Sequence, residues 1–173
     1  LEKALEYYNR SLHIREELGD KRLMVYSLKY IGKTFSEMKD YDKALDYYNR
    51  SLNLQEEMEN KRVTGQILYC IGEVYWYKGD LDKSLYYYNR SLNLREKIGD
   101  KHGIATSIQS IGWNYYEMGD YDKALDCYNR QIKIYEELGW EKWLYGINNN
   151  IGLVYYQQED YNKAIEYLDK SAI

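Results

Sequence analysis

The sequence has no proline, one phenylalanine and two cysteines among its 173 residues. Proline is the residue that most often interrupts helices and stiffens turns and linkers, so its absence makes helix the default expectation. No apolar run approaches the ~18 residues that indicate a membrane-spanning helix, and the opening LEKALEYYNR is not typical of a secretory signal. We therefore expect no membrane association.

Positive charge is also in short supply. The chain has 24 Lys and Arg against 28 Asp and Glu, which gives a formal net charge of −4. Proteins that bind nucleic acids neutralise phosphates with an excess of Lys and Arg, so this balance argues against a nucleic-acid partner.

The few cysteines and histidines do not suggest a metal site. Cys70 and Cys127 lie far apart in the sequence without a CxxC spacing, and neither His13 nor His102 is near a cysteine pair. Free thiols fit a reducing compartment, so we expect a cytoplasmic protein with no bound metal.

Motifs for catalysis are missing as well. The sequence has no glycine loop for phosphate, no nucleophile elbow and no metal-binding helix motif. Its acidic residues recur with Lys and Arg at helical spacing, which is typical of a solvated surface. We expect a protein that is not an enzyme and needs no cofactor.

What the sequence does contain is an internal repeat. The segment YYNRSL occurs at 7–12, 47–52 and 87–92, an Ile-Gly pair begins at 31, 71, 111 and 151, and Asp occupies 40, 80, 120 and 160. A fixed period of forty residues predicts a stack of similar units, because one such unit cannot bury its apolar face alone.

Each period predicts two helices. From Tyr41 onward, apolar or small residues that include Ala44 and Tyr48 recur at the i, i+3, i+4, i+7 spacing of one helical face. The preceding helix, about Lys21 to Met38, has its own apolar stripe. This stripe contains Gly32, so the two helices are expected to approach closely at that glycine and Ala44.

Short turns are expected to separate the helices. Asp40 and its equivalents are placed to cap the second helix of each repeat by accepting hydrogen bonds from amides of its first turn. Gly79 and Gly119 are placed to end the preceding helix in a left-handed conformation.

The predicted fold is all-α: an α-solenoid of nine helices in antiparallel pairs, in a single domain over residues 1–173. We expect 1–20 to be the second helix of a partial repeat, 21–60, 61–100 and 101–140 to be full repeats, and 141–173 to contain a first helix and a shortened second helix. Neither end shows a polar capping helix, so we expect a segment of a longer array.

This pattern resembles the tetratricopeptide repeat. The residues that carry the resemblance are Leu28, Ile31, Gly32, Phe35, Asp40, Tyr41, Ala44, Tyr48 and Ser51. The pattern recurs as Leu68, Ile71, Gly72, Tyr75, Ser84 and Tyr88 and as Ile108, Ile111, Gly112, Tyr115, Ala124 and Tyr128, whereas the fourth copy has Asn148 where a large apolar residue belongs. By its period the chain is closer to the longer repeats of kinesin light chains, and the family's closing proline is missing. The resemblance implies a right-handed superhelix whose concave face is lined by the first helix of each repeat.

The first helices are also the parts that differ most between repeats. Segments 41–60 and 81–100 agree at twelve of twenty positions, whereas 21–40 and 61–80 agree at six. Stacking explains the residues that repeat, so the residues that differ are candidates for ligand binding. On the predicted concave face they are Tyr26, Lys29, Lys33, Tyr69, Glu73, Trp76, Tyr77, Gln109, Trp113, Tyr116, Asn149, Leu153 and Tyr156.

These candidates have three expected roles. Tyr69, Trp76, Trp113, Tyr116 and Tyr156 are expected to be aromatic anchors, Lys29 and Lys33 to attract acidic groups, and Gln109 and Asn149 to hydrogen-bond a peptide backbone. Two alternatives remain open: the rings pack between helices without a ligand, and the lysines are solvated charges balanced by Glu37 and Glu73. Chaperone-binding members of the family clamp a C-terminal carboxylate with a Lys, Asn, Asn, Lys, Arg set, of which only Lys29 is matched here, so we expect no such clamp.

The sequence thus predicts a non-enzymatic scaffold that binds a protein or peptide ligand on its concave face. Two other functions remain open. One is self-association through exposed end helices. The other is a regulatory role within a larger multidomain protein.

Overall fold

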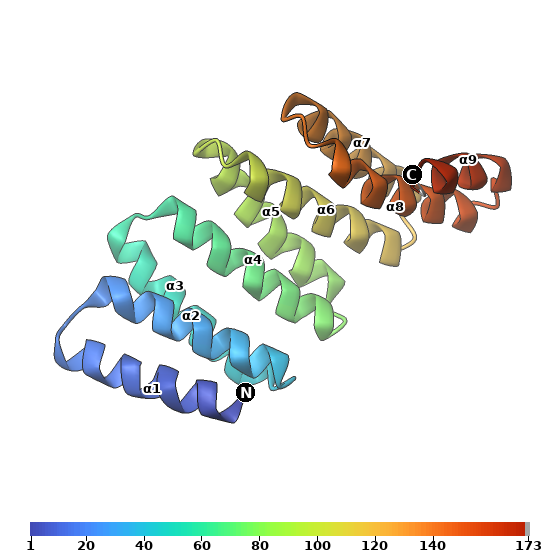
Figure 1. Cartoon of the computed structure of the whole chain (residues 1–173). Coiled ribbons are helices and arrows are strands. Elements are labelled where there is room, and N and C mark those ends of the chain that lie inside the picture. Colours follow the sequence, from blue (N-terminus) through green and yellow to red (C-terminus); the bar gives the residue numbers. More distant parts are fainter. Residues whose placement is uncertain (172–173) are drawn as a thin grey trace. The chain divides into compact units, whose positions relative to one another are not determined.

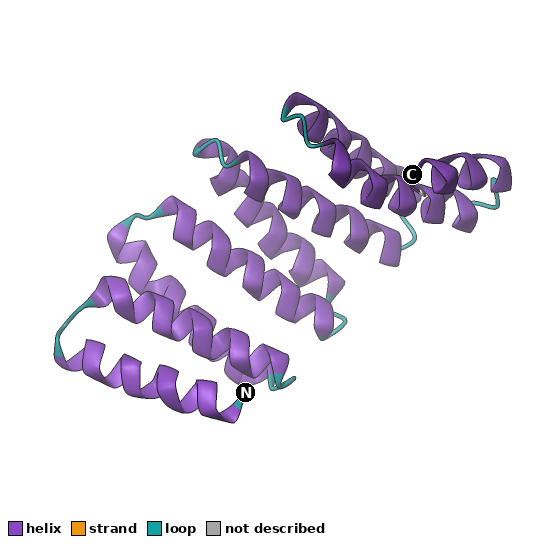
Figure 2. Ribbon diagram, in the orientation of Figure 1, coloured by secondary structure: helices purple, strands orange, loops and turns teal. Residues whose placement is uncertain are grey.

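The computed structural model describes residues 1–171, except for the side chain of Glu56. Over this range it contains nine α-helices, one short 3-10 helix and no strand (Figures 1 and 2). The α-helices are α1 (Glu2–Glu17), α2 (Lys21–Glu37), α3 (Tyr41–Met58), α4 (Lys61–Tyr77), α5 (Leu81–Lys97), α6 (Lys101–Glu117), α7 (Tyr121–Glu137), α8 (Leu144–Gln157) and α9 (Tyr161–Ser171). The all-α prediction with nine helices is confirmed over the described residues, and the predicted end of the last repeat at Ile173 lies outside them.

The helices form two compact units, Leu1–Ile98 with α1 to α5 and Gly99–Ile173 with α6 to α9. Each unit has its own apolar core, centred on residues such as Ile31 and Ile71 in the first and Tyr128 and Ile151 in the second. In the first unit α2 contacts both α3 and α4. Figure 1 shows α2 and α4 in front, with α3 and α5 behind them. The single domain stays a prediction.

Asp and Asn side chains cap most of the helices. The caps Asp20, Asp40, Asn60, Asp80, Asp100 and Asp120 each accept a hydrogen bond from the backbone N–H three residues later. Gly79 and Gly119, which follow α4 and α6, have φ angles of +78°. The predicted caps and left-handed turns are confirmed.

Each first helix meets its own second helix at a glycine. A Cβ added to Gly32 would lie 2.9 Å from the ring of Tyr48 and 3.2 Å from the carbonyl oxygen of Ala44. The contact recurs at 2.7 Å between Gly72 and Tyr88 and at 2.8 Å between Gly112 and Tyr128, while Gly152 faces Leu168 at 2.9 Å. The predicted close approach is confirmed, and in three of these pairs the side chain that uses the space is a tyrosine ring.

Small polar residues complete the same interfaces. Ser51 Oγ donates a hydrogen bond to the carbonyl oxygen of Val25 at 3.0 Å, and Ser91 Oγ donates to that of Gly65 at 2.7 Å. Both serines are fully buried. Their hydroxyls therefore have partners without needing water, and the helices stay close together.

A charged cluster marks the start of four second helices. Lys83 Nζ lies 2.7 Å from Asp80 Oδ2 and 5.3 Å from the centre of the Tyr75 ring. Equivalent clusters contain Asp40, Lys43 and Phe35; Asp120, Lys123 and Tyr115; and Asp160, Lys163 and Tyr155. The lysine hydrogen bond lowers the pKa of Asp40, Asp80, Asp120 and Asp160 below the ordinary aspartate value.

The fourth repeat departs from this pattern at its start. Trp140 occupies the place of a capping Asp or Asn, and it makes no side-chain cap. The chain then forms a 3-10 helix, Glu141–Trp143, and α8 begins only at Leu144. Asn148 in α8 is half-buried, whereas the equivalent Leu28 in α2 is fully buried, so this polar residue keeps access to solvent.

The glycine contacts generate a test with a matched control. We expect Gly72→Ala to lower the free energy of unfolding by about 1–3 kcal/mol, because overpacking against Tyr88 outweighs the helix-propensity gain of about 1 kcal/mol. Gly146→Ala in α8, where an added Cβ meets nothing within 4 Å, should instead stabilise the chain. Urea unfolding followed by circular dichroism measures both. A Gly72→Ala chain as stable as the native one would show that this ring contact relaxes without cost.

The lowered aspartate pKa values predict loss of stability in acid. Their contribution is present above the unfolded pKa of about 3.9 and is lost as the pH falls through the lower folded pKa. Replacing Asp40, Asp80, Asp120 and Asp160 together by Asn keeps a capping side chain but removes the titrating group. We expect this variant to lose less stability between neutral and acidic pH than the native chain, measured by urea unfolding at each pH. An unchanged acid dependence would assign the loss to other groups.

Candidate functional site

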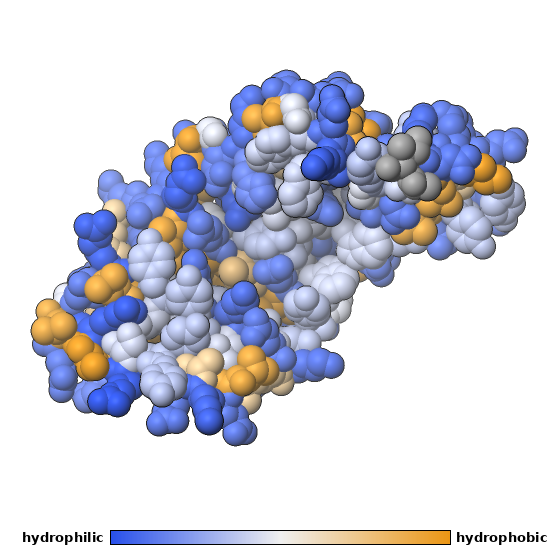
Figure 3. All heavy atoms as spheres, viewed as in Figure 1, coloured by the Kyte–Doolittle hydropathy of each residue, from blue (hydrophilic) through white to orange (hydrophobic). Residues whose placement is uncertain are grey.

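The first unit contains a groove of about 830 Å³ between α2 and α4, with a floor formed by α3 and α5. Five tyrosines line it: Tyr30, Tyr41, Tyr48, Tyr69 and Tyr77. In Figure 3, pale side chains of intermediate hydropathy lie among blue polar ones over α2 and α4. The groove has the size and the mixed aromatic and polar lining of a binding site for a flexible ligand.

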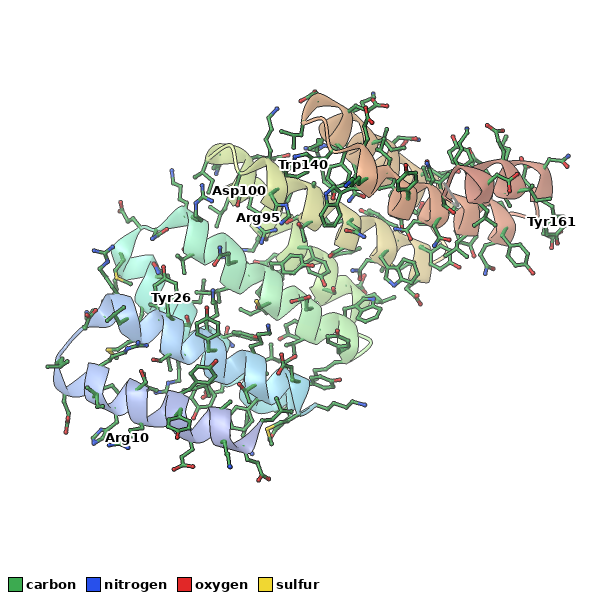
Figure 4. The ribbon with its side chains drawn as sticks, viewed as in Figure 1. Arg10, Tyr26, Arg95, Asp100, Trp140 and Tyr161 are labelled. Atoms are coloured by element: carbon green, nitrogen blue, oxygen red, sulfur yellow. The ribbon has the colours of Figure 1, made fainter. Side chains whose placement is uncertain are left out.

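The groove brings together five of the residues predicted from the sequence, namely Lys29, Lys33, Tyr69, Glu73 and Tyr77. Tyr26, labelled on α2 in Figure 4, lines a separate cavity of about 360 Å³ with Arg22 and Gln55. Trp76 packs edge-on against Tyr77 with 5.1 Å between ring centres and is not among the residues that line the groove.

The two predicted lysines have weak partners within the chain. Lys29 Nζ donates to Gln66 Oε1 at 3.2 Å and lies 5.3 Å from the centre of the Tyr30 ring. Lys33 Nζ is 3.8 Å from Glu37 Oε1, and both side chains are about half exposed or more. Such an exposed ion pair contributes little stability, so Lys33 keeps most of its capacity to attract an anion.

Arg95 is a groove residue that the sequence did not reveal. It comes from α5, it is 6% exposed, and its guanidinium lies 4.9 Å from the centre of the Tyr69 ring (Figure 4). The sequence places it on a second helix, which the repeat assigns to the framework. The available signal was that the equivalent positions hold Arg15, Gln55 and Tyr135, so this place varies between repeats although it lies on the more uniform second helix.

The interior of the groove is desolvated. Burial raises the pKa of the Glu73 carboxyl, and the positive charges of Lys33 and Arg95 offset part of that rise. Burial, assisted by the negative charge of Glu73, raises the pKa of the Cys70 thiol to about 11. Burial also raises the pKa of Tyr48. The thiol and the phenol are therefore neutral hydrogen-bonding groups at physiological pH, and Cys70 is not an activated nucleophile.

The remaining candidates lie in the second unit, where the rings contact one another. Trp113 stacks on Tyr116 with 5.1 Å between ring centres, and Gln157 Nε2 donates to the hydroxyl of Tyr116 at 3.3 Å. Tyr156 packs edge-on against Tyr161 at 5.7 Å. Gln109 and Asn149 are exposed, and Leu153 is half-buried. Trp113 and Tyr116 therefore pack against each other within the chain, and a ligand contact would be a second role for them.

Two further properties concern the described residues only. Within them no three His, Cys, Asp or Glu side chains gather in a way that could hold a metal ion. Among the same residues, no helix combines the length and the apolar character needed to cross a membrane.

Comparison with known proteins identifies the family. Models of the tetratricopeptide repeat match residues 1–57 and 63–137, and residues 145–172. The chain belongs to the tetratricopeptide repeat family. The resemblance inferred from the repeat is thereby confirmed. No curated protein matches the sequence of this tetratricopeptide repeat chain.

Several solved structures share the fold of this tetratricopeptide repeat chain. BtubC from P. vanneervenii matches with a TM-score of 0.89 and 20% identity, over 98% of this chain and 71% of its own. A putative kinesin light chain from Podospora anserina with nearly identical repeats matches with a TM-score of 0.81 and 11% identity, over 98% and 84%. The Rap conjugation gene regulator of plasmid pLS20, in complex with the Phr* peptide, matches at 0.73 and 21%, over 86% and 42%.

The raised pKa of Cys70 predicts slow alkylation. In a Cys127→Ser background, we expect iodoacetamide to modify Cys70 at neutral pH at least about tenfold more slowly in the native chain than in urea, because the thiolate is the reactive species. Mass spectrometry of timed samples measures both rates. Equal rates would mean that the Cys70 thiol is open to solvent and ionises normally.

Proposed function

We propose that this chain is a non-enzymatic protein-interaction module that binds a peptide or helical segment of a partner protein on the face formed by its first helices. The observation that carries the proposal is the groove of about 830 Å³, whose walls come from the first helices α2 and α4. Tyr and Trp dominate binding energies at interfaces because they bring large contact area with few rotatable bonds, and tyrosines form much of this groove.

Membership of the tetratricopeptide repeat family supports the proposal. The Rap regulator, which shares the fold, was solved in complex with the Phr* peptide. Its identity to this chain is 21%, so the likeness supports a peptide as a class of ligand and does not define a sequence. Both cysteines are free thiols, which supports our further proposal of a cytoplasmic location.

A library of random peptides displayed on phage and selected on the full chain tests this function. Tyr77→Ala removes a groove ring that is 55% exposed, and Tyr7→Ala removes a ring on α1 that is 70% exposed and does not line the groove. We expect Tyr77→Ala to weaken the selected peptides about tenfold and Tyr7→Ala to leave them unchanged. Affinity and melting temperature are measured together, because Tyr77 also stacks on Tyr41.

Three outcomes would contradict the proposal. No peptide is enriched, Tyr77→Ala lowers the melting temperature without changing affinity, or both variants bind alike. Sedimentation of the same samples across concentrations distinguishes the self-assembly alternative, which requires association without peptide.

A further inference from the structure

We propose that the groove between α2 and α4 binds an internal acidic segment of the partner in an extended conformation, with carboxylates two residues apart meeting Lys29 and Lys33. This inference rests on the proposed function and adds the chemistry and spacing of the ligand. The chain as a whole carries a formal charge of −4, whereas the lining of the groove has more positive than negative side chains.

Cations outnumber carboxylates in the lining of the groove. Lys29, Lys33, Lys39 and Arg95 face Glu37 and Glu73 there. A concave surface with low-dielectric walls concentrates this excess and raises the local concentration of an anionic partner. The groove is therefore complementary to an acidic ligand although the protein is acidic.

The two lysines on α2 supply the direct contacts. They are one helical turn apart on one face, and neither forms a strong ion pair within the chain, because Lys29 binds the neutral amide of Gln66 and Lys33 lies 3.8 Å from a solvated carboxylate. Two like charges at this spacing repel each other mildly. A ligand with two carboxylates relieves that repulsion and replaces weak partners with stronger ones.

The spacing of the lysines selects the spacing of the acids. Four residues of α-helix advance about 6 Å along the axis. Two residues of an extended strand advance about 6.6 Å and return the side chain to the same face. An extended segment lying along α2 therefore places acidic residues at positions i and i+2 opposite Lys29 and Lys33. Adjacent acidic residues point to opposite sides and satisfy only one lysine.

Two further charged groups of the groove, Arg95 and Glu73, also act on a bound ligand. The Arg95 guanidinium lies 4.9 Å from the centre of the Tyr69 ring and is 6% exposed, so its charge acts on the groove at short range in a desolvated setting. Glu73 opposes an acidic ligand with its negative charge, and burial disfavours that charge by raising the pKa of the carboxyl. Neutralising Glu73 should therefore strengthen the binding of an acidic segment while leaving the lysines in place.

The chemistry of the groove favours an internal segment over a terminal carboxylate. A single carboxylate needs several donors converging on one point. Here the partners of the lysines are the amide oxygen of Gln66 and the carboxylate of Glu37, and the two ammonium groups lie one helical turn apart along α2. Blocking both ends of the ligand should therefore not reduce binding.

The test uses the full chain and four pools of fluorescent peptides of about ten residues, long enough to span the groove. Their ends are acetylated and amidated, and the central positions are Glu-x-Glu, Glu-Glu, Gln-x-Gln or Lys-x-Lys in an otherwise identical random background. We expect the Glu-x-Glu pool to bind about tenfold more tightly than the Gln-x-Gln pool, and the preference to weaken with added salt, as measured by fluorescence anisotropy.

Three variants then locate the effect. Lys29→Gln with Lys33→Gln should abolish the preference for Glu-x-Glu. Lys3→Gln with Lys61→Gln changes the net charge equally at two exposed positions outside the groove and should leave the preference intact. Glu73→Gln should strengthen Glu-x-Glu binding severalfold. Circular dichroism confirms that each variant is folded.

The outcomes separate this inference from the proposed function. Equal binding of the Glu-x-Glu and Gln-x-Gln pools, or an effect of the control pair as large as that of the groove pair, would overturn the acidic ligand and leave a peptide-binding groove standing. Equal binding of Glu-Glu and Glu-x-Glu would overturn the spacing. Binding by none of the pools would overturn both this inference and the proposed function.

Discussion

The architecture depends on one contact, in which a tyrosine ring of a second helix lies directly against the bare backbone of a glycine in the first. The distances of 2.7–2.9 Å to a hypothetical Cβ at Gly32, Gly72 and Gly112 leave no room for any side chain. This contact sets the separation of the two helices and brings buried hydroxyls such as that of Ser51 within reach of a backbone carbonyl. Glycine, tyrosine and serine therefore act as one unit, and the repeats 21–60 and 61–100 contain all three of them.

The glycine–tyrosine contact uses the face of each first helix that meets its own second helix. The opposite face of the first helix takes no part in this contact. On α2 and α4 that face carries charged and aromatic residues that differ between repeats, and in the first unit they line a groove. In the second unit Trp113 and Tyr116 instead cover each other. Equivalent positions on the first helices therefore line an open groove in the first unit and form a stacked aromatic pair in the second, depending on the neighbouring side chains.

Much of the fold could be predicted because its determinants are local or periodic. The Asp caps, the glycine turns and the close approach at Gly32 all follow from spacing within one repeat. Two features could not be read in this way. Arg95 reaches the groove from a second helix, and its place there depends on how α4 and α5 pack. The later start of α8 goes with Trp140, which occupies the capping position without making a side-chain cap. The groove residues were proposed from one helix face, but which of them line a common cavity is a tertiary property.

The glycine contact also bears on how such a chain can change in length. In three repeats the tyrosine ring of the second helix contacts the backbone of a glycine in the first helix. This contact is the same in each of these repeats, because it does not depend on the side chains that differ between them. Duplication of the unit 21–60 or 61–100 would therefore recreate the glycine–tyrosine contact within the new copy without compensating substitutions. Arrays of this type can evolve new recognition surfaces by recombination between units, while their scaffold is inherited unchanged.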